Sequence, residues 1–335
     1  MMTPPPLPPE ALPIPRPPVD PTAPPVISVR DLHRTFGLVQ AVRGISFDVL
    51  PGQVVGFIGA NGAGKTTTMR MMATLDMPTA GTISVGGFDV LNDPSEVRRI
   101  VGWMPDSYGT YDNMTVLEYL DFFGRAHGFR ATERAKRVRE VMDFTDLTPI
   151  GDRMINKLSK GMGQRLCLGR TLLHDPQVLI LDEPAAGLDP KARVEFKRLV
   201  RLLAAAKKTI FISSHILTEL SEMCDTLLFI DAGQIVHHGA AEALDAHVGA
   251  DAIVDVQVAG PIAALSDWIS MQPGIALAET RKFGAAIRFE EASPEFLAAT
   301  LRKMVLDGLP VTGFHRESRK LEDAFIDMIK KLQDQ

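Results

Sequence analysis

The sequence predicts an α/β fold with a mostly parallel sheet, followed by a smaller α+β domain. Short runs rich in β-branched residues alternate with helical patterns from Val26 onward, which is typical of a parallel sheet flanked by helices. Two of these runs, 178–181 and 209–213, are short and apolar, as expected of central strands. A change in composition near Val248 then separates a segment with the order strand, helix, strand, strand, helix, strand.

Composition indicates a chain with a sizeable core that works inside the cell. Apolar residues make up 45% of the 335 residues, and a formal net charge of −5 gives no reason to expect a nucleic-acid partner. Cys167 and Cys224 lie in apolar stretches and are expected to be buried thiols in a reducing compartment. No apolar run approaches the roughly 18–20 residues that span a bilayer, and the N-terminus does not resemble a signal peptide. We therefore expect a soluble, cytoplasmic chain.

Three parts follow one another along the chain. Residues 1–25 hold half of the 24 prolines, so we predict a disordered or polyproline tail there. Residues 26–248 form the first domain, with a helical subdomain at about 106–165, and residues 249–335 form a second, ferredoxin-like domain. The strands and helices predicted outside the helical subdomain, besides the two central strands, are 26–29, 45–49, 54–58, 253–258, 262–271, 275–279, 285–289, 294–306 and 311–316, with a last helix from about Lys320.

A phosphate-binding motif follows the buried strand 54–58. Gly59-Ala60-Asn61-Gly62-Ala63-Gly64-Lys65-Thr66 fits the pattern G-x-x-x-x-G-K-[ST] and precedes a helix that runs through Thr67. Glycines let successive backbone N–H groups point at phosphate oxygens, and the helix start adds a partial positive charge. Lys65 would contact the β- and γ-phosphates and the Thr66 hydroxyl would bind Mg²⁺. The predicted nucleotide contacts are Gly59, Asn61, Gly62, Gly64, Lys65, Thr66 and Thr67. Alone, the motif predicts an NTPase without saying which kind.

Two carboxylates follow the apolar run 178–181. Asp182 and Glu183 stand at the carboxyl end of a predicted strand, where ligands collect on open α/β sheets. Asp182 would hold Mg²⁺ through water, and Glu183 would orient and deprotonate the attacking water. Such pairs are common at strand ends, so this reading depends on the P-loop in the same domain.

Three further segments narrow the NTPase to one family. Leu158-Ser159-Lys160-Gly161-Met162 places Ser159 as the N-cap of a helix and Gly161 where backbone can approach an anion closely. Gly187-Leu188-Asp189-Pro190 follows Glu183, and His215 follows the strand 209–213. With the P-loop, in this order across residues 27–247, these segments resemble the ATP-binding cassette (ABC) family, whose signature is usually L-S-G-G-Q.

The resemblance implies a fold, cofactors and partners. The family combines a P-loop NTPase core with an antiparallel β subdomain and an inserted helical subdomain. It binds ATP and Mg²⁺ and works as a dimer of identical or related ATPase subunits on the cytoplasmic face of the membrane, as a peripheral partner of an integral membrane permease. By this resemblance, Ser159 and Gly161 contact the γ-phosphate held by the other copy, Asp189 lies at the dimer interface, His215 contacts the γ-phosphate, and Phe36 stacks on adenine.

The chain departs from the common family pattern at several positions. Asp106 stands where the family usually has a glutamine, although a carboxylate can still reach Mg²⁺ through water. Ala185-Ala186 replaces a pair that is often polar, and Lys160 and Met162 replace Gly and Gln of the signature. None of these changes touches Lys65, Asp182 or Glu183, so we expect hydrolysis to be retained.

Two segments are similar to one branch of the family. Tyr108–Leu120 and Leu321–Phe325 resemble the type 2 exporters, which handle drugs, antibiotics, sodium or cell-envelope components. We therefore expect the ATP-hydrolysing subunit of an exporter that drives a separate permease by closure of the ATP-bound dimer. The alternatives are a non-transport ABC ATPase of the translation or DNA-repair type, an ABC importer subunit, and an unrelated P-loop kinase or GTPase.

Overall fold

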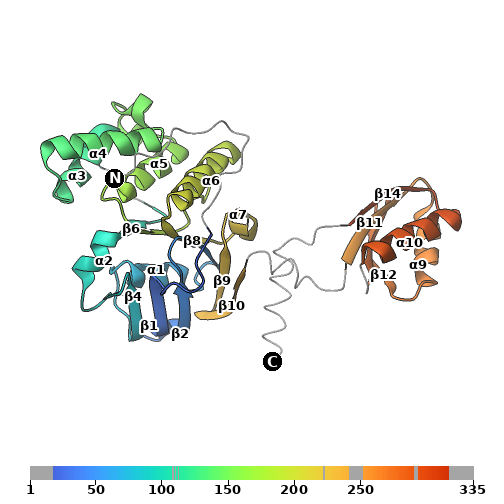
Figure 1. The fold of residues 1–335 in the computed structure, drawn as a ribbon. Coiled ribbons are helices and arrows are strands. Elements are labelled where there is room, and N and C mark those ends of the chain that lie inside the picture. Colours follow the sequence, from blue (N-terminus) through green and yellow to red (C-terminus); the bar gives the residue numbers. More distant parts are fainter. Residues whose placement is uncertain are drawn as a thin grey trace. The chain divides into compact units, whose positions relative to one another are not determined.

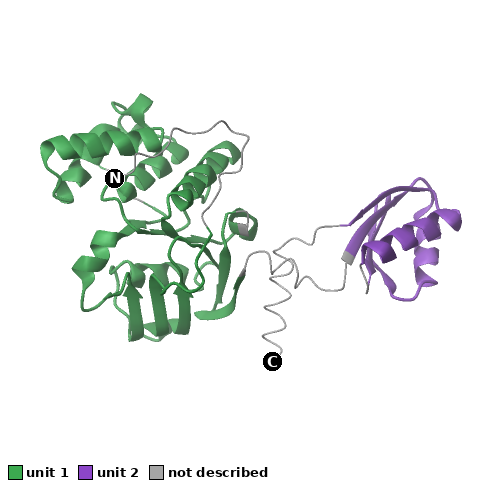
Figure 2. Cartoon of the chain, in the orientation of Figure 1, with its two compact units in different colours: residues 1–241 green, residues 242–335 purple. Residues whose placement is uncertain are grey.

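The computed structural model describes residues 18–107, 109, 111, 113–221, 223–240, 252–289 and 293–316. The chain forms two compact units, residues 1–241 and 242–335, which are described separately (Figure 2). Most of the predicted proline-rich tail, the predicted helix from Lys320 and the segment Leu321–Phe325 lie outside the described residues. Among the residues that are described, no helix is long and apolar enough to cross a membrane.

A six-stranded sheet forms the centre of the first unit. Its order is β10 (Gln234–Ala240), β9 (Thr226–Asp231), β3 (Val54–Ile58), β8 (Thr209–Ser214), β7 (Val178–Leu181) and β6 (Val101–Met104). Its strands β6, β8, β9 and β10 are labelled in Figure 1. The strands are parallel except for β10, which pairs antiparallel with β9 at one edge. Every residue of β3, β7 and β8 is buried, which explains the apolar sequence of β3 and β7 and the apolar middle of β8 at 210–212. The predicted α/β class is confirmed.

A four-stranded antiparallel sheet packs beside the central one. Its order is β2 (Val39–Val49), β1 (Ile27–Phe36), β4 (Ala80–Val85) and β5 (Phe88–Asp89). The strands predicted at 26–29 and 45–49 cover only parts of β1 and β2, because register shifts interrupt the apolar alternation along this pair. Phe47 of β2 stacks on Phe211 of β8 with ring centroids 5.6 Å apart, so the two sheets share a core.

Helices surround the sheets and form a subdomain between β6 and β7. The subdomain comprises α3 (Val116–Ala126), α4 (Ala131–Phe144), two 3₁₀ turns (Thr148–Ile150 and Ile155–Lys157) and α5 (Lys160–Leu172). The other helices are α1 (Lys65–Met72), α2 (Pro94–Ile100), α6 (Pro190–Ala205) and α7 (Leu217–Ser221). Of the apolar residues on α3, Tyr119 and Leu120 are buried, whereas Leu117 and Phe122 are 44% and 43% exposed.

The second unit has the predicted βαββαβ order. Its elements are β11 (Ala252–Val258), α9 (Ile262–Ser270), β12 (Ile275–Arg281), β13 (Gly284–Phe289), α10 (Pro294–Leu306) and β14 (Val311–Arg316). The sheet order β12-β13-β11-β14, with antiparallel pairing throughout, is that of a ferredoxin-like fold. Alternate residues of β11, including Val254 and Val256, are buried against a core to which Leu265 of α9 and Leu297 of α10 contribute. The fold predicted for this part is confirmed.

Candidate active site

The loop between β3 and α1 carries the P-loop sequence and curls around its own glycines. Gly62 and Gly64 have φ angles of +82° and +109°, which side chains other than glycine rarely adopt. Gly59 has a different reason to be glycine, because a Cβ there would collide with the carbonyl oxygen of Ile230 on the neighbouring strand β9. The exposed loop backbone at Asn61 and Gly62 ends at the N-terminus of α1, a favourable position for an anion.

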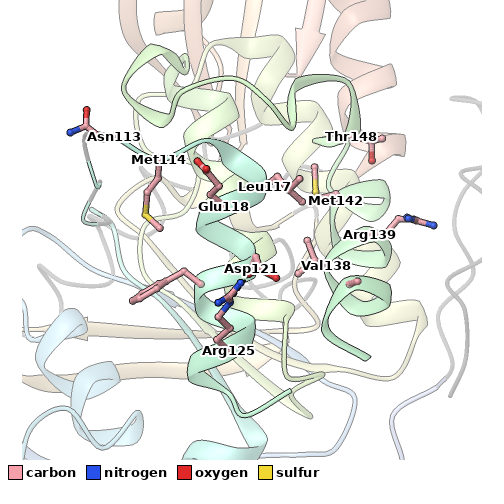
Figure 3. Close-up of a pocket in the computed structure, with 12 residues that line it drawn as sticks. Asn113, Met114, Leu117, Glu118, Asp121, Arg125, Val138, Arg139, Met142 and Thr148 are labelled. Carbon is pink, nitrogen blue, oxygen red and sulfur yellow. Dashed lines mark hydrogen bonds and ion pairs between the residues drawn. The ribbon is translucent and has the colours of Figure 1, made fainter. Parts of the chain in front are cut away.

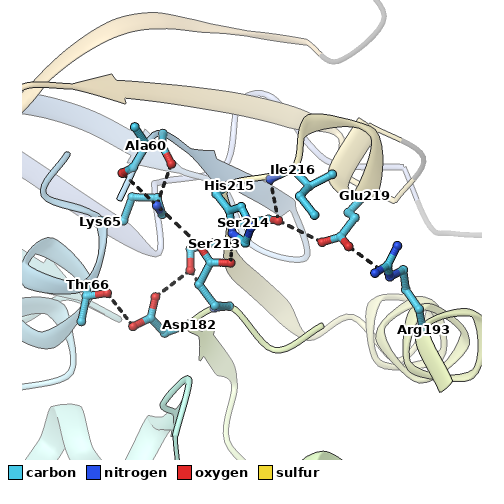
Figure 4. A network of polar contacts seen from close by, with 12 residues as sticks. Ala60, Lys65, Thr66, Asp182, Arg193, Ser213, Ser214, His215, Ile216 and Glu219 are labelled. Carbon is cyan, nitrogen blue, oxygen red and sulfur yellow. Dashed lines mark hydrogen bonds and ion pairs between the residues drawn. The ribbon is translucent and has the colours of Figure 1, made fainter. Parts of the chain in front are cut away.

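Lys65 reaches back across this loop toward a carboxylate. Its buried Nζ donates to the carbonyl oxygens of Gly59 (2.7 Å) and Ala60 (3.2 Å), as Figure 4 shows. The same Nζ lies 3.4 Å from Oε1 of Glu183. The ammonium is therefore held above the P-loop between backbone carbonyls and Glu183.

Asp182 is buried at the carboxyl end of β7 and is held on both oxygens. The Thr66 hydroxyl donates to Oδ2 (2.8 Å), and the Ser213 hydroxyl donates to Oδ1 (2.7 Å). Burial raises the pKa of Asp182, and the charges of Asp106 and Glu183 raise it further, against the two hydrogen bonds that lower it. A cation beside Oδ2 would stabilise the charged form of this buried carboxylate. Hydroxyl and carboxylate oxygens are ligands that suit Mg²⁺. The residues present therefore fit a Mg²⁺ site.

Glu183 sits next to Asp182 and is oriented by three neighbours. Its backbone N–H donates to the Ser213 hydroxyl (2.9 Å), and Oε2 lies 2.8 Å from Nδ1 of His215. Its φ angle of +46° is unusual for a residue other than glycine, which indicates a strained turn of the kind found at functional sites. Lys65 is the third neighbour, with its Nζ 3.4 Å from Oε1, which is buried and makes no hydrogen bond within the described part of the chain. This oxygen is available to accept a proton or a hydrogen bond from a bound water.

Two other predicted residues border this cluster. Asp106 is exposed just beyond β6, and its charge acts on Asp182. Phe36 ends β1 and is 45% exposed. The Arg34 guanidinium lies 4.1 Å from the centre of the Phe36 ring and pairs with Asp76 at 2.7 Å. With one face of the ring covered by Arg34, the other face can take a planar ring such as adenine.

Ser159, Gly161 and Asp189 form a second group, at the N-termini of α5 and α6. The Ser159 hydroxyl caps α5 by accepting from the N–H of Met162 (3.3 Å), and the Asp189 carboxylate caps α6 by accepting from the N–H of Ala192 (2.9 Å). Gly161 packs so closely against α6 that a Cβ there would lie 3.0 Å from the Cβ of Ala192. Ser159 and Asp189 are exposed, so both helix starts are open to another molecule.

Ser213 is a member of the cluster that sequence reasoning missed. It is the second-last residue of β8, the strand next to β7, so its hydroxyl comes out at the same sheet edge as Asp182 and Glu183. The available signal was a polar residue at the carboxyl end of an apolar strand, the same pattern that identified Asp182. Sequence reasoning had used only His215 from this strand end.

Comparison with known proteins supplies the family. The profile of the family described as "ABC transporter" matches residues 42–186. The ATP-binding protein NatA of Bacillus subtilis is 38% identical over 224 residues, which cover 65% of this chain and 91% of NatA. The Nod factor export ATP-binding protein I of Ralstonia nicotianae is 36% identical over 306 residues, which cover 90% of this chain and 93% of that protein.

A solved structure agrees with these relatives. CbiO1 of Clostridium perfringens, described as part of the ABC transporter complex CbiONQ, superimposes with a TM-score of 0.61 at 25% identity, covering 66% of this chain and 91% of CbiO1. The strand order, the P-loop cluster and the relatives lead to one conclusion. This chain belongs to the ABC transporter family, as a subunit that binds and hydrolyses ATP.

Proposed function

We propose that this chain drives export through a membrane permease by hydrolysing MgATP between two ATPase subunits. The main support is the Glu183 carboxylate, which lies between Lys65 (3.4 Å) and His215 (2.8 Å) beside the hydrogen-bonded pair Thr66–Asp182. A general base, its orienting histidine and a phosphate-binding lysine are thus within reach of one γ-phosphate. The relative named for Nod factor export matches over both units, which favours an exporter over an importer or a non-transport ATPase.

Mg²⁺ would be held by Thr66 and Asp182, with Asp106 acting through water. The Thr66 and Asp182 oxygens are 2.8 Å apart, so both can face one ion that keeps several of its waters. Bound there, the ion would neutralise charge on the β- and γ-phosphates. Lys65 would leave the carbonyls of Gly59 and Ala60 to contact the same phosphates.

Hydrolysis to ADP and phosphate then needs one proton transfer. Glu183 Oε1 would accept a proton from the attacking water as that water bonds to the γ-phosphorus and ADP leaves. His215 would contact both Oε2 and the γ-phosphate and so keep the carboxylate beside the phosphate. Ser213 would keep the carboxylate aimed by binding the backbone N–H of Glu183. Phe36 would hold adenine on the ring face that Arg34 leaves free.

We propose that a second copy, or a related ATPase subunit, completes each site with Ser159, Gly161 and Asp189. Support comes from the exposed N-terminus of α5, which carries a partial positive charge and a serine hydroxyl suited to a γ-phosphate. Gly161 packs against Ala192, so the N-termini of α5 and α6 lie side by side and would face the partner subunit together.

A groove on the helical subdomain is the proposed docking site for the permease, on the cytoplasmic face of the membrane. The groove lies between α3 and α4 and has a volume of about 890 Å³ (Figure 3). Its apolar floor includes the exposed Leu117 and Phe122 together with Met114, and charged groups such as Asp121 and Arg125 border it. An apolar groove with a charged rim suits a short amphipathic helix of the permease.

A mixing experiment tests the shared site. Ser159→Arg should block the γ-phosphate contact, and Glu183→Gln should remove the base, so each protein alone should hydrolyse almost no ATP. A mixed dimer has one pocket that keeps both Ser159 and Glu183, so mixing should restore a measurable fraction of the wild-type rate. Failure to regain activity, with both variants binding ATP, would rule out a site shared between identical copies.

Membrane binding tests the permease groove. Leu117→Arg should release the full-length chain from membranes of its source cell while leaving its ATPase activity intact. Leu91→Arg is a matched control, because Leu91 is 49% exposed but lies between β5 and α2, away from the groove. If both variants stay bound to the membranes, the groove is not the docking site.

A further inference from the structure

Glu219 is a buried carboxylate outside the proposed catalytic group of Lys65, Glu183 and His215. It lies on the short helix α7, and only 4% of its surface is exposed. The Ser214 hydroxyl donates to its Oε2 (3.0 Å). Its Oε1 forms an ion pair with Nε of Arg193 on α6 at 3.1 Å, and within the described residues neither of these two atoms makes a hydrogen bond. A charge buried to this degree is costly unless it is paired, so the position of Glu219 is tied to that of Arg193.

Arg193 connects this carboxylate to the segment 187–190. Its Nη2 donates to the carbonyl oxygen of Leu188 (3.4 Å), immediately before Asp189. Arg193 also lies in the first turn of α6, the helix that Asp189 caps. A displacement of the segment 187–190 would therefore move the guanidinium that holds Glu219.

Ser214 connects the other end of Glu219 to His215. While its hydroxyl donates to Glu219, it accepts from the backbone N–H of Ile216 (3.0 Å), so it fixes the backbone on both sides of His215. Figure 4 shows the resulting row of polar contacts from Arg193 through Glu219 and Ser214 to the neighbourhood of His215. His215 in turn contacts Glu183 at 2.8 Å.

We propose that Glu219 is a positioning residue that couples the segment 187–190 to the contact between His215 and Glu183. The proposal rests on the proposed function, in which Asp189 lies at the interface with a second ATPase subunit. Docking of that subunit on the segment 187–190 fixes the position of Arg193. Glu219, paired with Arg193, then fixes the Ser214 hydroxyl, and Ser214 holds the backbone that places His215 against Glu183. Each copy would thereby hydrolyse ATP only when its partner is seated. Glu219 itself contacts no reacting atom.

Glu219→Gln in the full-length chain tests this coupling. Glutamine keeps the size of the side chain and an oxygen for the Ser214 hydroxyl, but it removes the charge that holds Arg193. We expect kcat to fall by about tenfold or more while KM for ATP stays within about twofold, since the P-loop is untouched. Asp255→Asn is the matched control, because it breaks the 2.9 Å pair with Arg281 in the second unit and should leave both constants unchanged.

A double variant separates positioning from general destabilisation. If Glu219 acts through His215, then Glu219→Gln combined with His215→Ala should be no slower than His215→Ala alone. The proposal would be overturned if the two losses in kcat multiply in the double variant, or if kcat for Glu219→Gln equals that of wild type. If wild type and Asp255→Asn both lack ATPase activity, the proposed function itself fails, and the inference with it.

Amide hydrogen exchange gives a readout that does not depend on activity. The N–H of Ile216 should exchange faster in Glu219→Gln than in wild type, because Ser214 loses its charged partner. The N–H groups of β8 residues such as Phe211 should exchange as before, since their ladder bonds are unchanged. Equal exchange at Ile216 in the two proteins would overturn the proposal.

Discussion

His215 and Glu183 meet at 2.8 Å, although 32 residues separate them and they follow different strands. The contact exists because β7 and β8 are parallel neighbours, so their carboxyl ends come out at the same sheet edge. Ser213 reinforces it by binding both Asp182 and the backbone of Glu183. The catalytic carboxylate is thus oriented from its backbone and from its side chain.

Replacing Glu183 by glutamine should separate ATP binding from hydrolysis. The amide keeps the shape of the side chain but cannot accept a proton from water, so the rate of phosphate release should fall by about 10²–10⁴. ATP affinity, measured with a fluorescent analogue, should change little. Glu279→Gln on the exposed face of β12 is the control and should hydrolyse ATP like wild type. A Glu183→Gln protein with a normal rate would assign the base to another group.

Replacing Ser213 by alanine should lower both stability and activity. The change leaves the buried Oδ1 of Asp182 and the N–H of Glu183 without the Ser213 hydroxyl, a loss of about 1–3 kcal/mol. Urea unfolding measures this loss. Ser270→Ala, which removes an exposed hydroxyl bonded to Asp267 in the second unit, should shift the free energy of unfolding by less than about 0.5 kcal/mol. Equal midpoints for the two variants would contradict the bridging role of Ser213.

Two glycines of the P-loop should respond differently to alanine. A Cβ at Gly59 meets the Ile230 carbonyl oxygen, so Gly59→Ala should cost about 1–3 kcal/mol or more through displaced backbone. A Cβ at Gly62 would have no atom within 4 Å, so the φ angle of +82° is the source of strain there. Gly62→Ala should therefore lower the free energy of unfolding by about 1 kcal/mol. Unfolding without nucleotide, followed by Trp103 fluorescence in a Trp268→Phe background, isolates the first unit. A larger loss for Gly62→Ala would show that the packing argument is wrong.

Much of the fold could be predicted because several strands are wholly buried, such as β3 and β7, or alternate between buried and more exposed residues, such as β11. The bounds predicted for β3, β7, α10 and β14 are those of the structure, since turn residues flank a clear apolar pattern. β1 was predicted too short, because register shifts after Val29 bring polar residues such as Arg30 into the strand. The exposure of Leu117 on α3 was not foreseen, since apolar periodicity alone does not distinguish a core face from a groove.

Motifs located the candidate site, but they did not supply its supporting contacts. Lys65, Asp182 and Glu183 belong to local patterns whose chemistry can be read from the sequence. The pair Arg193–Glu219 is different, because each residue is an ordinary charge on a helix until the fold buries one against the other. Such pairing depends on the placement of α6 and α7 around β8, which no local pattern encodes.

A stacked pair of histidines should make the first unit sensitive to acid. His127 at the end of α3 stacks on His174 with ring centroids 4.5 Å apart, and burial, with the charge of His174, lowers the pKa of His127 from 6.5 to about 4. Between these values the unfolded chain binds a proton that the folded chain resists, so this stability is complete above about pH 6.5 and is lost as pH falls toward 4.

His127→Phe should therefore flatten the acid side of the stability profile. Phenylalanine can stack on His174 but does not titrate, so the variant should lose less free energy of unfolding than wild type between about pH 7 and pH 4.5. Urea unfolding at several pH values, with Trp103 as the reporter in the Trp268→Phe background, measures the difference. Near pH 7.5 the two proteins should be similar, because both rings are then uncharged in the folded and unfolded chains. Parallel profiles down to pH 4.5 would mean that His127 takes up its proton without unfolding this unit.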